Sequence, residues 1–285
     1  MKRITVIIFV STIFLQRTVA QTAFTTDSIR KAEMQLRQFS DSITMGSTDR
    51  IRQFSLASFN PAFLDLLKNK ETFNYPFDSL PTISKLSSND KKLKIYTWLI
   101  ASKETGLYQY YGVLQRINPV SGEMKVIGLT DFKIPVEIAD TSELKTDTWY
   151  GAAYYELIEK KIGKKPYYFL LGWKGIDFET TQKVIDVIYF DFWDNPTFGA
   201  PVFTDETRKK KHRLIFRYNA QAVMSLRYDK KKKMILFDHL SASSPSMKGQ
   251  YKAYGPDFTY DGLQFKKGTW IYKSNLDLRN PGQRK

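Results

Sequence analysis

Residues 152–173 read AAYYELIEKKIGKKPYYFLLGW and contain two apolar, aromatic-rich runs on either side of a basic turn. We predict that Ala152–Glu159 and Pro166–Trp173 are paired strands joined at Lys160–Lys165, because aromatic and aliphatic runs bounded by turn residues favour a β-hairpin. A helix over Tyr154–Ile158 is the alternative. The same hairpin pattern recurs through the second half of the chain, so this stretch indicates the fold class.

Strand patterns also precede and follow this hairpin. Runs of aromatic and β-branched residues predict strands over 93–100, 108–117, 124–129, 184–190, 214–218, 223–228, 234–237, 258–265 and 269–273. Met224, Leu226 and Tyr228 alternate with polar residues, which is the period-two pattern of a half-buried strand. We expect residues 214–237 to form a three-stranded meander.

The segment before the strands has a helical pattern. Residues 21–72 carry apolar residues at helical spacing, with a second helix start at Ser47–Asp49 and a break or kink expected at Asn60–Pro61. The helices would form either a layer packed on the sheet or an arm that binds an envelope protein partner.

The whole pattern predicts an α+β protein that is mainly β, with N-terminal helices followed by an antiparallel sheet of hairpins in a meander, sandwich or barrel-like arrangement. A chain of 285 residues is long enough to bury a sizeable core. The expected divisions are a signal peptide over 1–20, a helical lead over 21–72, a linker or loop over 73–90, an antiparallel β domain over 91–278 and a basic tail over 279–285.

The first twenty residues have the pattern of a secretion signal. A basic start at Met1–Arg3 precedes the apolar run Ile4–Leu15, and Thr18–Ala20 offers a small residue before a cut. The run is shorter than the roughly 20 apolar residues that cross a membrane, although an uncleaved anchor is the alternative. The chain has no cysteine, which excludes disulfides and thiolate metal sites. We expect export, the periplasm as the favoured compartment, and no transmembrane span after signal removal.

The formal charge of +15 favours anionic partners. We expect anionic lipid, lipopolysaccharide or acidic glycan, and no nucleic acid, because the chain is expected to be exported. In an up-and-down meander the basic turns would all lie at one rim, provided that residues 199–203 add no strand. The predicted anion-binding rim consists of Lys160, Lys161, Lys164, Lys165, Lys209, Lys210, Lys211, Arg213, Lys230, Lys231, Lys232, Lys266 and Lys267. The alternative is that these lysines only keep turns soluble and deter edge pairing.

The opposite rim is expected to carry long loops over 174–182 and 241–256, where binding sites commonly lie. Aromatic rings and carboxylates there could bind a glycan, or two carboxylates about 5–9 Å apart could hydrolyse one. The predicted ligand-loop residues are Trp173, Asp177, Asp191, Trp193, Asp194, Tyr254, Asp257, Tyr260 and Asp261. The alternative is that aromatic residues, 15% of the chain, fill a β core.

The sequence has no recognisable catalytic or cofactor motif. Glycine-rich nucleotide loops and Gly-x-Ser-x-Gly are absent. His212 lies in a basic run, and His239 follows Asp238, so these two neighbours would point to opposite faces of a strand. Asp191–Asn195 offers oxygen atoms for calcium, but turn capping is the stronger interpretation. We predict no metal, no cofactor, and a binding protein rather than an enzyme.

Four short segments resemble a known family. LGWKG at 171–175, FGAPVF at 198–203, FDHL at 237–240 and YGPDFTYDG at 254–262 are similar to segments of uncharacterised exported proteins of Bacteroidota, within residues 145–280. The resemblance implies a Gram-negative envelope and carries no activity with it. The ending does not resemble that group's C-terminal sorting domain, which favours the periplasm. We expect an envelope binding protein, with a glycan-active hydrolase or an accessory subunit of an envelope machine as alternatives.

Overall fold

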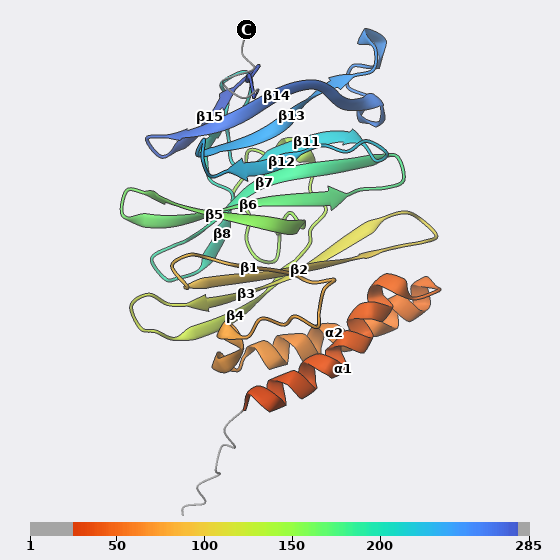
Figure 1. The fold of residues 1–285 in the computed structure, drawn as a ribbon, viewed down its shortest axis with the longest axis vertical. Coiled ribbons are helices and arrows are strands. Elements are labelled where there is room, and N and C mark those ends of the chain that lie inside the picture. Colours follow the sequence, from red (N-terminus) through yellow and green to blue (C-terminus); the bar gives the residue numbers. More distant parts are fainter. Residues whose placement is uncertain (1–24, 279–285) are drawn as a thin grey trace, which may run out of the picture.

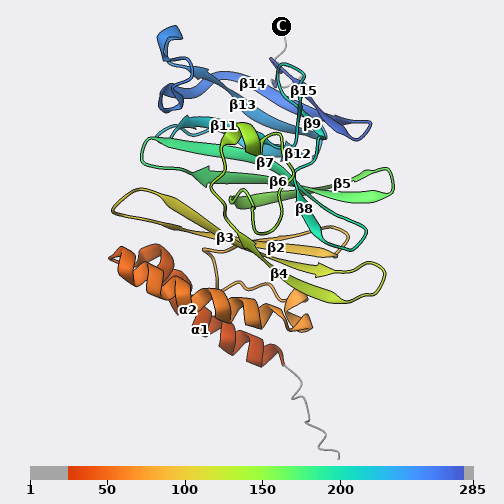
Figure 2. The same cartoon turned by 180° about the vertical axis from the view of Figure 1, so that it is seen from behind.

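The computed structural model describes residues 25–278, which form one layer of helices and three stacked β-sheets (Figures 1 and 2). The predicted fold class, α+β and mainly β with helices first, is confirmed. The signal peptide predicted over 1–20 and the tail predicted over 279–285 lie outside the described residues. Within residues 25–278, no helix has the length and apolarity that crossing a membrane requires.

The helical layer consists of α1 (Thr26–Met45) and α2 (Asp49–Leu67), followed by the short 3-10 helix η1 (Lys70–Asn74). The side chain of Thr48 caps α2 by accepting a hydrogen bond from the backbone N–H of Ile51 (3.3 Å). Helix α2 continues through Pro61 and is not broken there. Phe59 and Phe63 on either side of this proline are fully buried, so core packing outweighs the lost backbone hydrogen bond.

The first sheet has the order β1-β2-β3-β4 and is antiparallel throughout: β1 (Ser84–Ser87), β2 (Leu93–Ala101), β3 (Tyr108–Ile117), β4 (Met124–Thr130). Alternate residues of β2 face opposite ways. Tyr96 and Trp98 pack against the helices, whereas Leu93 and Ile95 face the second sheet. The helices therefore form a layer on the protein's own sheet.

The segment predicted as a linker over 73–90 is part of the packed structure. It contains β1, which pairs with β2, and Phe77, Leu80 and Ile83 are buried in the core between the helices and the first sheet. Its proline, serine and asparagine residues mark turns rather than a boundary between domains. The loop prediction agrees with the irregular stretches 75–83 and 88–90, whereas the interpretation of the segment as a boundary between domains is corrected.

The second sheet has the order β11-β7-β6-β5, and a short strand β8 also pairs with β7. Its strands are β5 (Ala153–Ile162), β6 (Lys165–Gly175), β7 (Thr180–Phe190), β8 (Pro196–Phe198) and β11 (Leu214–Asn219). The segment Tyr154–Ile158 is strand, not helix. The connection from the first sheet includes the one-turn helix α3 (Val136–Ala139).

The third sheet has the order β10-β9-β15-β14-β13-β12. Its strands are β9 (Phe203–Thr204), β10 (Lys210–Lys211), β12 (Leu226–Asp229), β13 (Met234–Ala242), β14 (Tyr254–Lys266) and β15 (Thr269–Lys273). Two 3-10 turns, η2 (Pro245–Met247) and η3 (Tyr251–Ala253), lie between β13 and β14. The meander predicted over 214–237 is wrong, because β11 joins the second sheet while β12 and β13 pair in the third.

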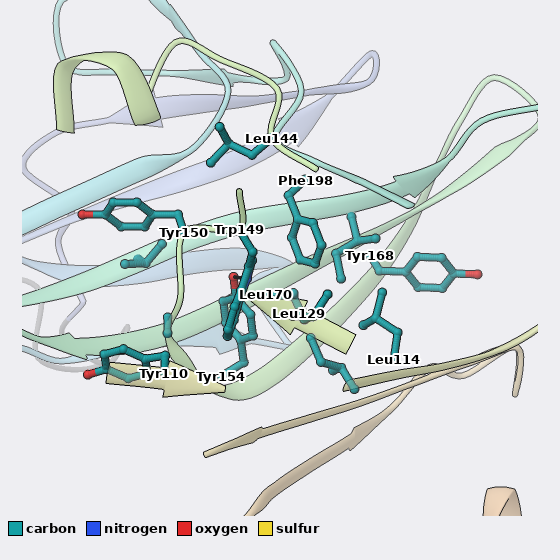
Figure 3. Close-up of a cluster of buried hydrophobic side chains, with 14 of the residues drawn as sticks. Tyr110, Leu114, Leu129, Leu144, Trp149, Tyr150, Tyr154, Tyr168, Leu170 and Phe198 are labelled. Atoms are coloured by element: carbon teal, nitrogen blue, oxygen red, sulfur yellow. Dashed lines mark hydrogen bonds between the residues drawn. The ribbon is translucent and has the colours of Figure 1, made fainter. Parts of the chain in front are cut away.

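The second sheet is buried on both faces. Tyr168 and Leu170 of β6 point into the core shared with the first sheet (Figure 3), and Phe169 and Leu171 point into the core shared with the third. Because both faces are buried, the segment Pro166–Gly172 (PYYFLLG) is apolar throughout and does not alternate between apolar and polar residues.

One charged pair lies inside this doubly covered sheet. Asp186 in β7 and Arg213, just before β11, are both fully buried, and Arg213 Nε donates to Asp186 Oδ1 over 3.2 Å. Tyr154 Oη donates to the other carboxylate oxygen (3.1 Å). Arg213 Nη1 also donates to the backbone carbonyls of Ala139 and Ser142. The guanidinium thus ties β7 to the segment that connects the first and second sheets.

Replacing Arg213 by methionine should cost about 3–5 kcal/mol in the free energy of unfolding, because it leaves the Asp186 carboxylate buried and unpaired. Urea denaturation measures the loss. The double variant Arg213→Met, Asp186→Leu should be more stable than Arg213→Met alone, since it removes the unpaired charge. Arg227→Met is the control: its exposed contact with Asp229 is 3.7 Å long, so the change should stay within about 0.5 kcal/mol. Equal effects at Arg213 and Arg227 would contradict the assignment.

Candidate functional site

Three basic hairpin turns lie side by side at one edge of the stack, on the left in Figure 1: those of β5–β6, β12–β13 and β14–β15. A Cβ added to Gly268 would lie 3.0 Å from Cγ2 of Ile162, so two of the turns are in contact. Lys160 Nζ donates to Tyr228 Oη (3.1 Å) and lies 6.0 Å from the centre of the Phe265 ring. These contacts join β5 to β12 and β14.

The exposed lysines of these three turns form what we call the lysine edge. They are Lys161, Lys164, Lys165, Lys230, Lys231, Lys232, Lys233, Lys266 and Lys267. Within residues 25–278, none of them forms a salt bridge. Lys160 is half-buried and joins the two sheets, so it does not belong to the exposed set.

The fourth predicted basic cluster, residues 208–213, does not extend the lysine edge. β9 runs parallel to β15, so the chain after Thr204 leads away from the turn at 266–268. Lys210 and Lys211 form β10, and Lys211 binds Asp140. Arg213 is the buried partner of Asp186, so among these predicted rim residues of the described chain only Lys209 and Lys210 are exposed without an ion pair. The assumption that residues 199–203 add no strand is wrong, and the predicted rim is corrected here.

The predicted ligand-loop residues lie in three separate places. Trp173 and Asp177 lie at the loop between β6 and β7, where Trp173 packs edge-on against Tyr108. Asp191, Trp193 and Asp194 form the turn at the opposite end of β7. Tyr254, Asp257, Tyr260 and Asp261 belong to β14 in the third sheet. The two long loops do meet at the edge opposite to the lysine edge, where Lys252 Nζ lies 3.1 Å from Glu179 Oε1. The group Asp191, Trp193 and Asp194 lies at the other end of β7, so the prediction of a single rim holds only in part.

The Asp191–Asn195 turn uses its carboxylates for structure. Asp191 Oδ1 accepts hydrogen bonds from the backbone N–H groups of Trp193 and Asn195, both over 2.8 Å. Asp194 is buried and accepts from Arg116 Nε over 3.0 Å. Within residues 25–278, no group of three or more acidic or histidine side chains is arranged to hold a metal ion.

Asp261 and His239 form a pair that local sequence inspection missed. His239 Nδ1 donates to Asp261 Oδ2 over 2.6 Å, Tyr272 Oη donates to the same oxygen, and the backbone N–H of Asn275 donates to Oδ1 over 3.0 Å. The other imidazole nitrogen of His239 lies 4.0 Å from Asp257 Oδ2. A register shift between Asp238 and Leu240 lets His239 reach Asp261 on the neighbouring strand.

The environment of His239 favours its protonated form. Burial alone would lower the pKa of His239, but the hydrogen bond to Asp261 and the charges of Asp261 and Asp257 outweigh burial and raise the pKa. A cavity of about 400 Å³ beside it also exposes Asp205 and Glu206. Within the described chain, no serine or threonine hydroxyl hydrogen-bonds to His239, so the pair lacks the nucleophile contact of a hydrolytic triad.

Comparison of the chain with protein-family models, with curated proteins and with solved structures found no match.

The two histidines of the chain should titrate on opposite sides of the ordinary histidine pKa of about 6.5. The carboxylates beside His239 raise its pKa, whereas burial lowers the pKa of His212. A raised folded-state pKa adds stability below about pH 6.5 that is lost as pH rises through that pKa. Proton NMR of the two rings gives both midpoints, assigned with His212→Gln. Asp261→Asn should lower the His239 midpoint and leave His212 unchanged; an unmoved His239 midpoint would contradict the pairing.

Proposed function

We propose that this protein is an exported binding protein that docks on anionic envelope material through the lysine edge. The observation that supports it is the meeting of three hairpin turns from two different sheets, each with exposed and unpaired lysines. If the lysines served only to keep each turn soluble, the three lysine-bearing turns would not need to lie next to one another.

Lysine suits a diffuse anionic surface. Its ammonium group is a compact, strongly hydrated charge on a flexible side chain, and it attracts phosphate as a point charge. The planar guanidinium of arginine instead binds a single phosphate or carboxylate group through two parallel hydrogen bonds. Juxtamembrane lysines contribute about 1 kcal/mol each near an anionic leaflet. Such attraction weakens as salt rises, because exposed charges are screened over about 8–10 Å at ordinary ionic strength.

Export and an envelope location are supported by the Met1–Ala20 pattern and by the resemblance to exported proteins of Bacteroidota. We place the protein in the periplasm on this basis. The lysine edge would there meet phospholipid or lipopolysaccharide headgroups, with acidic glycans as the other source of negative charge.

The two alternatives have less support. The predicted glycan hydrolase requires two of the loop carboxylates in one cleft, but Asp191 and Asp194 lie in the turn between β7 and β8, whereas Asp257 and Asp261 lie on β14. Asp194 and Asp261 are also already engaged by Arg116 and His239. An accessory subunit that uses residues 21–72 would have to bind through the outer side of the helices, because their apolar stripe is buried against the first sheet.

Removing one lysine from each turn should weaken membrane binding. The variant Lys164→Gln, Lys231→Gln, Lys266→Gln should bind vesicles that contain phosphatidylglycerol roughly 150-fold more weakly, because three lysines at about 1 kcal/mol each contribute about 3 kcal/mol. Vesicle co-sedimentation over a salt series measures the affinity. Wild-type binding should fall steeply with salt and should be absent on pure phosphatidylcholine.

The matched control carries the same charge change elsewhere. Lys31, Lys70 and Lys248 are exposed and lie outside the three turns, so their replacement by glutamine should change the affinity little. Equal loss in the two triple variants would show that only net charge matters and would reject the docking edge. Binding to a soluble acidic polysaccharide but not to vesicles would reject the lipid surface as the target.

A further inference from the structure

A second cavity, of about 540 Å³, opens at the end of β6 and the start of β7. Because β6 and β7 are antiparallel, these two strand ends lie together, on the side of the second sheet opposite to the lysine edge. Leu107, Ile134, Val136 and Ile176 form an apolar wall. The volume lies within the roughly 300–1,000 Å³ typical of small-molecule sites.

The floor of the cavity is a fixed ion pair. Lys174 Nζ lies 4.8 Å and 4.6 Å from the ring centres of Tyr110 and Tyr150, whose hydroxyl groups project on the same side in Figure 3. It donates to Asp131 Oδ1 (3.0 Å) and to the backbone carbonyl of Gly151 (2.6 Å). Burial lowers the pKa of Lys174, against the charge of Asp131. Lys174 and Asp131 therefore already have hydrogen-bond partners, and together they form the floor of the cavity.

Two donors at the cavity remain without a hydrogen bond. Gln182 is buried, and its Oε1 accepts from Tyr150 Oη over 2.6 Å. Within residues 25–278, no hydrogen bond engages the amide nitrogen of Gln182 or the guanidinium of Arg217. Arg217 rests on the Tyr251 ring (4.0 Å), and its nearest carboxylate oxygen, on Glu137, is 3.6 Å away, too far for a hydrogen bond.

We propose that this cavity binds a small amphipathic carboxylate, with its apolar body against the wall and its carboxylate on Arg217 and Gln182. A guanidinium matches the planar, two-oxygen geometry of a carboxylate. The exposed Lys133 at the mouth adds a positive charge, whereas Asp131 and Glu137 disfavour a doubly charged headgroup. The site does not depend on the lysine edge, so either proposal can fail alone.

Isothermal titration of the full chain with dodecanoate tests the proposal. Dodecanoate should bind saturably with one molecule per chain. Dodecan-1-ol should bind at least about tenfold more weakly, because it lacks the negatively charged oxygens to which Arg217 would donate hydrogen bonds. Arg217→Ala should weaken dodecanoate binding by about tenfold or more and leave the weak binding of the alcohol unchanged. Arg227→Ala, an exposed arginine in the third sheet, should bind as the wild type does.

A second variant decides the matter if Arg217→Ala does not fold, as thermal unfolding would show. Lys133→Glu reverses an exposed charge at the mouth and should weaken dodecanoate binding several-fold, more at low salt than at high salt. Absence of saturable binding, equal affinity for acid and alcohol, or unchanged affinity in both Arg217→Ala and Lys133→Glu would overturn the proposal.

Discussion

A carboxylate in the middle of a sheet that is covered on both faces must be paired, and the architecture is organised around that requirement. Asp186 sits between apolar neighbours in β7, so its charge is tolerable only beside Arg213 and Tyr154. Arg213 in turn needs carbonyl acceptors, which Ala139 at the end of α3 and Ser142 just after it supply. Apolar replacements of such pairs are often equally stable. We therefore assign the pair a positional role: it fixes where β11 meets β7 and how the chain passes from the first sheet to the second.

The long strands of the second sheet also separate two chemically different ends of the molecule. One end of β6 leads into the lysine edge, and the other leads to Lys174 and the apolar cavity. A protein held on an anionic surface by the lysine edge would present the cavity away from that surface. Gly199 is needed where it stands: its φ is +84°, and a Cβ would lie 2.6 Å from the Arg213 guanidinium.

Local patterns predicted the elements well and their partners poorly. The bounds of β3 and β15 agree with the aromatic and β-branched runs, because alternation reports which residues a strand buries. Alternation does not say which strand lies alongside, so β11 was assigned to the wrong sheet. Arg213 stands in a run of exposed basic residues, and composition alone does not distinguish it from Lys209. The pairing of His239 with Asp261 depends on cross-strand register and a bulge, neither of which a single sequence displays.

The layering has a consequence for a chain that is synthesised from its N-terminus. The helices, the first sheet and strands β5 to β7 are complete by Phe190, but one face of β6 and β7 is covered only by residues that come later. Phe169 packs against Phe203 and against Trp270, and Trp270 lies 101 positions further along the chain. Before the third sheet forms, this apolar face of β6 and β7 is exposed to solvent. Contacts between residues this far apart in the sequence form slowly. The partly folded chain would be protected from self-association by a chaperone that covers this face. Passage through a membrane before folding would have the same effect.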